Sequence, residues 1–261
     1  MNQPKRPSFP ARLGPPGAQA AAKPVVRPVN AAARPAAVMP APMGVGLDSV
    51  AVRSRMVQRL ATSGITSPAV LQAMGAVERH LFVDTALVNQ AYEDTSLPIG
   101  LAQTISKPSV VARMIELLLN AEGARNGLGR VLEIGTGCGY QAAVLGRVAK
   151  EVYSIERLRG LHEKARNNLR PLRLTNVHLI FGDGMVGYAQ GAPYAGIIAA
   201  AGGEAVPAAW CDQLAVGGRL VAPMAQSNGQ QILLVIDKTP YGFNETVLEA
   251  VNFVPLKSGI A

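Results

Sequence analysis

The stretch VLEIGTGCGY, residues 131–140, decides the fold of this chain of 261 residues. It joins a short apolar run to glycines at every second position, Gly135, Gly137 and Gly139. The run is typical of a buried parallel strand, and glycines let the backbone turn sharply and approach a ligand closely. The dinucleotide fingerprint G-x-G-x-x-G would need a glycine where this chain has Tyr140. The stretch therefore predicts a strand, turn and helix that hold a ligand without a pyrophosphate; an ordinary glycine-rich turn is the alternative.

Three acids stand at the ends of successive apolar runs: Glu133, Glu156 and Asp183. Glu156 lies 21 positions after Gly135 (156 − 135), close to the spacing at which an acid binds a ribose diol in nucleotide-binding α/β proteins. Asp183 could accept a hydrogen bond from an adenine amino group, and Glu133 could face a cationic amino-acid end. Each acid alone is equally well explained as a helix N-cap or a solvated strand end. Together they favour S-adenosylmethionine as the cofactor.

Apolar runs that predict strands alternate with helical patterns in the second half of the chain. Strands are expected at 130–134, 151–155, 177–181 and 195–200, and helices at 141–149, 159–169 and 207–214, with a shorter piece near 185–189. The runs at 230–237 and 245–256 flank Tyr241-Gly242 and predict an antiparallel hairpin. This order predicts an α/β fold with a doubly wound, mainly parallel sheet. Ligands bind such sheets at the carboxyl ends of the strands, where the three acids lie.

Helices are also expected before the first of these strands. Apolar residues at helical spacing predict a helix at 48–62, and Ser67-Pro68 reads as an N-cap followed by an early proline. Ser106-Lys107-Pro108 repeats that signal before a strongly apolar helix at 110–119. A loop is expected around Pro98 and Gly100. The part of the domain before the first of these strands is therefore expected to be a small helical cap.

Residues 1–47 differ in composition from the rest of the chain. They hold six basic residues, no acid and 10 of the 19 prolines. Such a segment has few large apolar residues to bury, so we expect a disordered basic tail followed by one domain at 48–261. A solvated or weakly anion-binding tail is favoured over a targeting segment. The domain carries 19 basic and 17 acidic residues (25 − 6 against 17), so its net charge of +2 gives little indication of nucleic-acid binding.

Two cysteines, Cys138 and Cys211, provide neither a disulfide framework nor metal-ligand spacing. We expect both to be reduced and no metal to be bound, which makes the cytoplasm the default compartment. No apolar run approaches the roughly 18 residues that a membrane helix needs. No membrane association is expected.

The order of short motifs from about residue 50 to residue 257 indicates a family. The motifs are RHLFV (79–83), AYEDTSLPIG (91–100), QTISKP (103–108), VLEIGTGCGYQAAVL (131–145), VYSIER (152–157), GDGMVGY (182–188), APY (192–194), GGRLVAP (217–223) and FVPL (253–256). This series resembles the protein-L-isoaspartate O-methyltransferases, a family with a Rossmann-like methyltransferase fold. QTIS and the terminal FVPL are its more specific parts. The resemblance implies methyl transfer to the α-carboxylate of L-isoaspartyl residues in damaged proteins, which initiates repair through a succinimide.

The resemblance also implies roles for individual residues. Ser106 is the expected catalytic residue, with a helix N-cap as the alternative. The expected cofactor-binding residues are Thr104, Ile105, Glu133, Gly135, Gly137, Glu156, Arg157, Asp183 and Gly184. The expected substrate-binding residues are Ser106, Val254, Pro255 and Leu256. An ordinary hydrophobic edge strand is the alternative for the last three.

The acceptor chemistry explains what the sequence lacks. A carboxylate with a reference pKa near 3.3–4 is already anionic at neutral pH and needs no general base. The histidines His80, His162 and His178 are therefore expected to have no catalytic role. The enzyme is expected to act as a monomer on isoaspartyl proteins and peptides, mainly by orienting the reacting groups.

Three departures from the family pattern stand out. Leu101-Ala102 replaces a pair that is often glycine-rich, Ala195-Gly196 lacks a common acid, and residues 1–47 are expected to match nothing in the family. A methyltransferase of RNA or of a small molecule is the competing enzyme, but 201–204 lacks the Asn/Asp-Pro-Pro-aromatic motif of base methyltransferases. A non-catalytic protein that keeps the cofactor fold is the competing class.

Overall fold

The computed structural model describes residues 50–261. The expectations for the N-terminal tail, and for a domain boundary at residue 48, fall outside these residues. No helix within the described part is long and apolar enough to span a bilayer.

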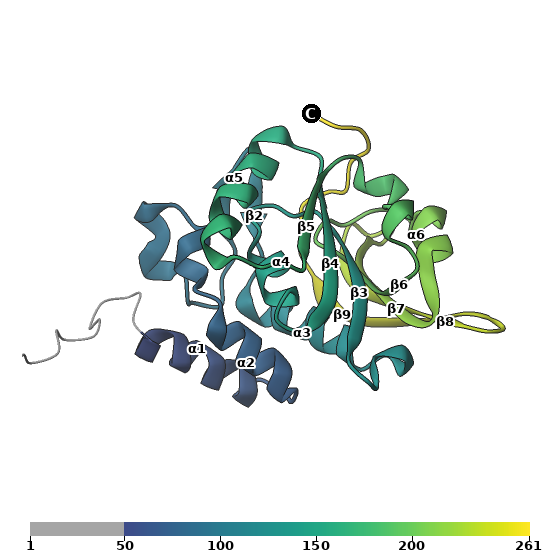
Figure 1. The fold of residues 1–261 in the computed structure, drawn as a ribbon, viewed down its shortest axis with the longest axis horizontal. Helices are drawn as coiled ribbons and strands as arrows, with labels where there is room; N and C mark the ends of the chain where they lie inside the picture. Colours follow the sequence, from purple (N-terminus) through teal and green to yellow (C-terminus); the bar gives the residue numbers. More distant parts are fainter. Residues whose placement is uncertain (1–49) are drawn as a thin grey trace, which may run out of the picture. The chain divides into compact units, whose positions relative to one another are not determined.

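A seven-stranded sheet lies at the core of these residues (Figure 1). Its order is β5-β4-β3-β6-β7-β8-β9. The strands are β3 Leu128–Ile134, β4 Ala149–Glu156, β5 Val177–Phe181, β6 Tyr194–Ala199, β7 Leu214–Ala225, β8 Gln231–Thr239 and β9 Gly242–Val251. Strands β3 to β7 pair in parallel, whereas β8 and β9 are added antiparallel. The doubly wound, mainly parallel sheet with a C-terminal hairpin is confirmed.

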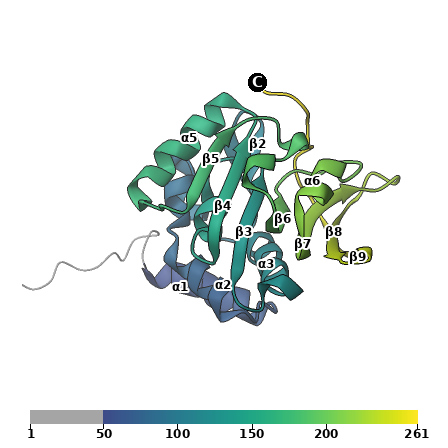
Figure 2. The same cartoon turned by 45° about the vertical axis from the view of Figure 1, so that its right-hand side comes forward.

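Alternate residues of the central strands pack on opposite faces of the sheet, as the period of two in a strand requires. On β3, Val131 belongs to a large apolar cluster, whereas Leu132 belongs to a second cluster that contains Trp210. Residues of five helices contribute to the first cluster, and residues of one helix contribute to the second. Figure 2 shows the ribbon of the helices beside the sheet. The five are α1 Val50–Thr62, α2 Pro68–Ala76, α3 Pro108–Leu119, α4 Tyr140–Leu145 and α5 Arg159–Leu169, and the one is α6 Ala208–Gln213.

Small residues let α3 approach the sheet closely. A Cβ atom at Gly196 of β6 would lie 3.2 Å from Leu118 Cδ2 of α3. The departure at Ala195-Gly196 therefore bears on the packing of this helix against the sheet.

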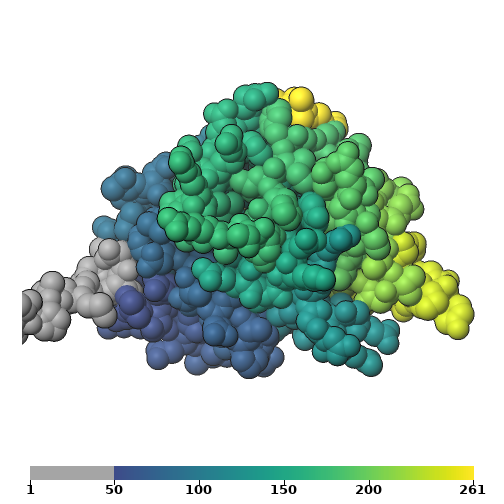
Figure 3. Space-filling view, in the orientation of Figure 1, coloured from purple at the N-terminus to yellow at the C-terminus, as the bar shows by residue number. Residues whose placement is uncertain are grey.

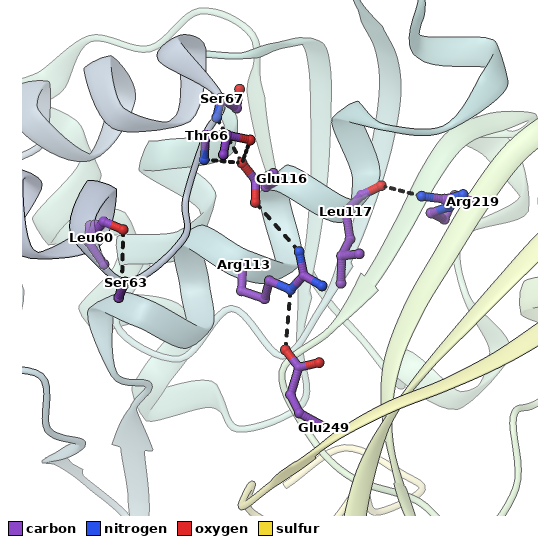
Figure 4. Close-up of polar contacts among 9 residues, drawn as sticks. All are labelled: Leu60, Ser63, Thr66, Ser67, Arg113, Glu116, Leu117, Arg219 and Glu249. Carbon is purple, nitrogen blue, oxygen red and sulfur yellow. Dashed lines mark hydrogen bonds and ion pairs between the residues drawn. The ribbon is translucent and has the colours of Figure 1, made fainter.

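A polar cluster ties α3 to its neighbours (Figure 4). The buried carboxylate of Glu116 in α3 accepts hydrogen bonds from the backbone N–H groups of Thr66 (2.7 Å) and Ser67 (2.8 Å), just ahead of α2. Arg113 of α3 pairs with Glu116 at 3.6 Å and with Glu249 of β9 at 3.3 Å. These contacts hold both α2 and β9 against the helix that follows the QTIS motif.

Short elements complete the description. A two-stranded hairpin consists of β1 Leu97–Gly100 and β2 Gln103–Ile105. The 3-10 helices are η1 Arg79–Phe82, η2 Thr85–Gln90, η3 Glu122–Ala124, η4 Arg170–Leu172, η5 Gly184–Val186 and η6 Ala189–Gly191.

The local expectations succeed in part. Ser67 caps α2 by accepting a hydrogen bond from the N–H of Val70, and α5 has the expected bounds. The loop expected around Pro98 is wrong, because those residues pair with β2. The helix expected at 141–149 ends at Leu145, since β4 already begins at Ala149. The last strand ends at Val251, well before its expected end at residue 256.

Candidate cofactor and substrate site

A cavity of about 240 Å³ opens at the carboxyl ends of the parallel strands. Nine residues that the sequence analysis assigns to the site line it: Thr104, Gly135, Gly137, Glu156, Arg157, Gly184, Val254, Pro255 and Leu256. They come from the β1–β2 hairpin, from the loops after β3, β4 and β5, and from the segment after β9. The fold thus gathers five separate parts of the chain around one space.

The glycine loop after β3 requires glycine for its backbone conformation. Gly135, Gly137 and Gly139 have φ angles of +91°, +58° and +91°, which residues with a Cβ atom rarely adopt. A Cβ atom at Gly139 would also lie 3.0 Å from Leu169 Cδ1. Because no side chain stands at Gly135 or Gly137, bare backbone forms this wall of the cavity. A ligand can approach it closely.

Glu156 ends β4 and presents a carboxylate to the cavity. One oxygen accepts the N–H of Gly137 at 2.8 Å, and the other accepts the N–H of Leu158 at 2.9 Å. An ionised carboxylate has about four acceptor positions. Glu156 therefore keeps lone pairs for two further donors, such as the hydroxyls of a ribose diol.

Glu133 lies beneath the glycine loop and outside the cavity wall. Its side chain is fully buried, and one oxygen accepts a hydrogen bond from the Ser154 hydroxyl, which contacts Thr136 Oγ1 at 2.6 Å. The other oxygen has no partner among the described residues. Burial raises the pKa of Glu133 to about 8. Direct contact between this carboxyl and a cationic ligand, as the sequence suggests, does not match this geometry; the side chain instead supports the loop from below.

Asp183 also lies outside the cavity wall, although its neighbour Gly184 lines it. One carboxylate oxygen accepts the N–H of Met185 at 2.8 Å and so caps η5. The other accepts the N–H of Gly259 at 2.6 Å. The N-cap alternative is thus observed for Asp183. Ile105 is likewise buried behind the cavity, next to Thr104.

Leu101 and Ala102 form the turn of the β1–β2 hairpin and line the cavity. Their φ angles are +51° and +55°. A two-residue hairpin turn with positive φ at both positions favours glycine or asparagine, which accounts for the glycine-rich pair common in the family pattern. Each side chain here costs about 1–2 kcal/mol in that conformation. Leu101 is 59% exposed, so little packing offsets the strain.

Ser106 follows β2 and is half-buried. The N-cap of α3 is Lys107, and the first turn is capped by Asp94, whose carboxylate accepts the N–H of Ser109 at 2.8 Å and its hydroxyl at 2.7 Å. The N-cap interpretation of Ser106 is therefore wrong. The hydroxyl of Ser106 makes no hydrogen bond within residues 50–261, so it is free to donate to a ligand.

Arg79 is a site residue that sequence reasoning missed. Its guanidinium is fully buried and donates hydrogen bonds to the carbonyls of Ala91 (2.7 Å), Ser106 (2.8 Å) and Thr95 (3.4 Å). It also lies 4.8 Å from the centre of the Tyr140 ring. Burial lowers the pKa of Arg79. One cation thus joins the backbone of three segments at the position of Ser106; only the RHLFV motif indicated its importance.

The segment after β9 reaches the cavity by pairing with Gly202. The carbonyl of Val254 accepts the N–H of Gly202 at 2.8 Å, and the N–H of Leu256 donates to the carbonyl of Gly202 at 2.7 Å. Backbone groups of successive residues in an extended chain point to opposite sides. Pro255 therefore presents its carbonyl to the other side and has no N–H to offer. Backbone pairing of a substrate with this segment would be limited to such outward groups.

Residues 257–261 are a second feature that sequence reasoning missed. Lys257 lines the cavity, and Arg157 Nε donates to the carbonyl of Gly259 at 2.7 Å. The N–H of Ala261 donates to the carbonyl of Arg157, and the N–H of Arg159 donates to the carbonyl of Ala261, both at 2.8 Å. The segment therefore packs beside the end of β4. No motif in the sequence indicated this path.

The histidines lie away from the cavity. His80 Nδ1 contacts Tyr92 Oη at 2.7 Å, and His178 packs against Tyr153. His162 is half-buried rather than solvated, and burial, with Arg166 nearby, lowers its pKa. No group of three or more His, Cys, Asp or Glu side chains suited to a metal ion occurs in the described part of the chain.

Sequence comparison decides the family. The profile of the protein-L-isoaspartate(D-aspartate) O-methyltransferase (PCMT) family matches residues 51–261. The chain belongs to this family. A protein-L-isoaspartate O-methyltransferase of Methylibium petroleiphilum is 57% identical over 262 aligned positions, which cover 97% of this chain and 96% of the relative. A relative of the same name from Burkholderia mallei is 51% identical, and the alignment covers 97% of this chain and 84% of the relative.

Solved structures of PCMT-like proteins share the fold. A protein-L-isoaspartate O-methyltransferase has a TM-score of 0.71 at 28% identity, and the superposition covers 80% of this chain and 67% of the solved chain. A Plasmodium falciparum structure in complex with S-adenosyl-L-homocysteine has a TM-score of 0.67 at 23% identity and covers 78% of this chain and 98% of its own.

The comparisons correct one expectation about the N-terminal segment. The alignments with the Methylibium and Burkholderia family members cover 97% of 261 residues, so they must include most of residues 1–47. The expectation that this segment matches nothing in the family is therefore wrong. The family profile itself begins only at residue 51.

Proposed function

We propose that this family member transfers the methyl group of S-adenosylmethionine to the α-carboxylate of L-isoaspartyl residues in damaged proteins and peptides. Membership of the family over residues 51–261 and 57% identity to a relative of that name support the proposal. The observation that carries it is the cavity where the glycine loop, Glu156 and residues 254–256 meet. The free hydroxyl of Ser106 follows the hairpin that borders this cavity.

The residues around the cavity fit the cofactor. Bare backbone at Gly135 and Gly137 allows close approach, and Glu156 keeps acceptor positions for two ribose hydroxyls. When bound, S-adenosylmethionine supplies an electrophilic methyl group on a sulfonium. Gly184, Arg157 and Thr104 would contact it from the other walls. In this proposal Glu133 and Asp183 act indirectly, by supporting the loop and by holding residue 259.

The acceptor needs orientation rather than activation. An α-carboxylate is ionised at neutral pH and is itself the nucleophile. In the proposal Ser106 donates a hydrogen bond to one carboxylate oxygen, and the buried charge of Arg79, 2.8 Å from the Ser106 carbonyl, favours an anion nearby. Positioning of this kind contributes on the order of 7–11 kcal/mol. The resulting ester then closes to a succinimide, and hydrolysis returns some normal aspartate.

A methyl-transfer assay with two synthetic peptides tests the function. The peptides are identical except that one contains a normal aspartyl linkage and the other an isoaspartyl linkage. We expect labelled methyl only on the isoaspartyl peptide, followed by release of label as methanol at mildly basic pH. Cofactor binding without label on either peptide would overturn the proposal and favour a non-catalytic protein.

Replacement of Ser106 tests the role of its hydroxyl. S106A should lower kcat by roughly 10- to 100-fold, the range expected for loss of one hydrogen bond to a charged group, with cofactor affinity changed less than about twofold. Isothermal titration measures the affinity, and the labelled peptide measures the rate. S63A, which removes a hydroxyl in the helical cap, is the matched control. An S106A enzyme with wild-type kcat would remove Ser106 from the mechanism.

We further infer that the enzyme is a cytoplasmic monomer with a methyltransferase domain at 48–261, a basic tail at 1–47 and no nucleic-acid partner. Both cysteines of the chain are free thiols, which suits a reducing compartment, and the domain is nearly balanced in charge. Light scattering on the full chain should give the monomer mass. Limited proteolysis should stop near residue 48, and a stable larger fragment would contradict the boundary.

A further inference from the structure

A second groove lies at the edge of the sheet, between β5 and the end of α5. It has a volume of about 550 Å³. Its apolar lining residues are Leu169, Leu174, Val177 and Leu179, and its polar ones are His162, Arg166, Asn167, Arg170 and Arg173. No acid lines it. This α5–β5 groove is separate from the cofactor cavity, with which it shares no lining residue.

The arginines of the α5–β5 groove carry uncompensated charge. The side chains of Arg166, Arg170 and Arg173 make no ion pair or hydrogen bond with other described residues. Arg166 and Arg170 are four positions apart at the end of α5, where like charges repel. The dipole of α5 favours a cation at its C-terminus, but this effect is confined to the last turn. It therefore does not account for three arginines around one apolar groove. The charges are arranged for an anionic partner.

The strand beside these arginines is an open edge. Within residues 50–261, β5 pairs with β4 alone, so one row of its backbone N–H and C=O groups is unpaired. Val177 and Leu179 face the groove, whereas His178 between them packs against Tyr153. An extended peptide that adds to such an edge obtains backbone hydrogen bonds and places alternate side chains along the groove.

We propose that the α5–β5 groove binds an acidic, extended segment of a protein substrate, added to β5 and held by Arg166, Arg170 and Arg173. This inference rests on the proposed function, because deamidation of asparagine gives the substrates of that reaction extra carboxylates. The chain's own tail is excluded as the occupant by its charge, with six basic residues and no acid in 1–47. Nucleic acid is less suited, since an open strand edge pairs with peptide and no Phe, Tyr or Trp lines the groove to stack on bases.

A pair of tethered substrates tests this groove on the full-length enzyme. Each carries the same isoaspartyl peptide, a Gly/Ser linker of about 25 residues that spans roughly 25–30 Å, and a strand segment of either Glu-Val-Glu-Val-Glu or Gln-Val-Gln-Val-Gln. At low salt we expect the acidic substrate to have a kcat/KM roughly three- to tenfold higher, and the advantage to shrink at high salt.

Charge-matched variants locate the effect. R166Q/R170Q should abolish the advantage of the acidic substrate, whereas R55Q/R125Q, which removes two exposed cations elsewhere, should keep it. Both variants retain the basic tail, so binding of carboxylates to the tail affects them equally. Arg173 is left in place because its φ angle of +48° would confound a substitution with a change in backbone strain.

The possible outcomes separate this inference from the proposed function. An equal advantage in both variants would overturn the groove as the binding site. A single-stranded oligonucleotide that outcompetes the acidic segment, with affinity lost only in R166Q/R170Q, would replace the peptide by nucleic acid. Fluorescence anisotropy of the labelled acidic segment, without any isoaspartate, reports on the groove even if methyl transfer fails. A neutral substrate methylated at the wild-type rate by both variants confirms that the catalytic site is intact.

Discussion

Two turns with positive φ border the cofactor cavity, and only one of them consists of glycine. The loop after β3 places Gly135, Gly137 and Gly139 at φ of +91°, +58° and +91°. The turn of the β1–β2 hairpin places Leu101 and Ala102 at +51° and +55°. The first turn adopts its conformation without strain, whereas the second carries strain in both residues.

The difference shows how the site is divided. The glycine loop packs against α5 and is supported by the buried Glu133, so its wall of the cavity is rigid. The hairpin turn is exposed at Leu101, and Arg79 donates to the carbonyls of Thr95 and Ser106 on either side of the hairpin. Strained, weakly packed segments cluster where binding requires adjustment. We infer that the glycine-loop wall of the cavity is preformed and that the hairpin wall moves.

Arg79 is the contact on which the hairpin side depends most, and its removal should have the largest effect. R79A would leave one buried and two partly buried carbonyls without this donor and create a cavity beside Tyr140. We expect a loss of about 3–5 kcal/mol in the free energy of unfolding. Urea denaturation measures it. R79K keeps the charge and some of the hydrogen bonds, so it should recover part of the stability.

The effect of Arg79 should also be specific to the substrate side. In R79K we expect KM for an isoaspartyl peptide to rise several-fold, while the affinity for S-adenosylmethionine stays within about twofold. If R79K weakened binding of the peptide and of S-adenosylmethionine equally, the glycine loop and the hairpin would form one unit. A loss in R79A below 1 kcal/mol would contradict the central role of this cation.

Glu133 provides the corresponding test of the glycine side, through pH. Its pKa is raised from 4.5 to about 8 in the folded protein. Below pH 4.5 the Glu133 carboxyl is protonated in both the folded and the unfolded protein, so its burial carries no cost of neutralisation. Between pH 4.5 and pH 8 the carboxyl loses its proton only in the unfolded protein, which favours unfolding. Stability therefore falls as pH rises through this window, by about 1.4 kcal/mol per unit.

E133Q should remove this slope. The amide oxygen can still accept from Ser154, and no proton is lost, so the variant should overtake the wild type in stability between pH 5 and pH 8. Thermal denaturation at several pH values measures the crossing. E122Q, which changes an exposed acid, should follow the wild-type curve. Parallel curves for E133Q and wild type would show that Glu133 is ionised in the fold.

The glycine side is also the side that could be predicted from the sequence. Strand β3, the loop after it and α5 follow from local patterns: an apolar run, alternating glycines and helical spacing. Glu156 was found because its spacing from Gly135 reflects one strand–helix–strand unit. The lining of the cavity by residues 254–256 followed from resemblance alone, because nothing local brings that segment to the sheet edge.

The rest depends on contacts between distant residues. Glu133 and Asp183 have the expected positions in the chain, but the direction of each side chain is set by Ser154 and by Gly259. The β1–β2 hairpin is expected to be a loop because of Pro98 and Gly100, whereas both residues pair with β2. Arg79 reads as a surface cation until its three carbonyl partners are known. Tertiary contacts override local preference at each of these positions.

Gly139 sharpens the comparison by separating strain from packing. G139A introduces a methyl at φ +91° and 3.0 Å from Leu169 Cδ1, so we expect a loss of about 2–4 kcal/mol. G64A is the matched control: φ is +109°, and nothing lies within 4 Å of the added methyl. The free energy of unfolding of G64A should fall by about 1–2 kcal/mol, from backbone strain alone. Equal losses in urea denaturation would show that α5 yields and that the glycine loop is less rigid than proposed.

Ala102 gives the smallest effect and the opposite sign. A102G relieves positive-φ strain of about 1–2 kcal/mol but gives the unfolded chain about 0.5–1 kcal/mol of additional conformational entropy. We therefore expect a net gain between zero and about 1.5 kcal/mol, which for a domain of this size raises Tm by up to about 3–6 °C. If A102G instead destabilised the protein by more than 1 kcal/mol, the turn would be held by its side chains, and the division into a rigid and a strained side would fail.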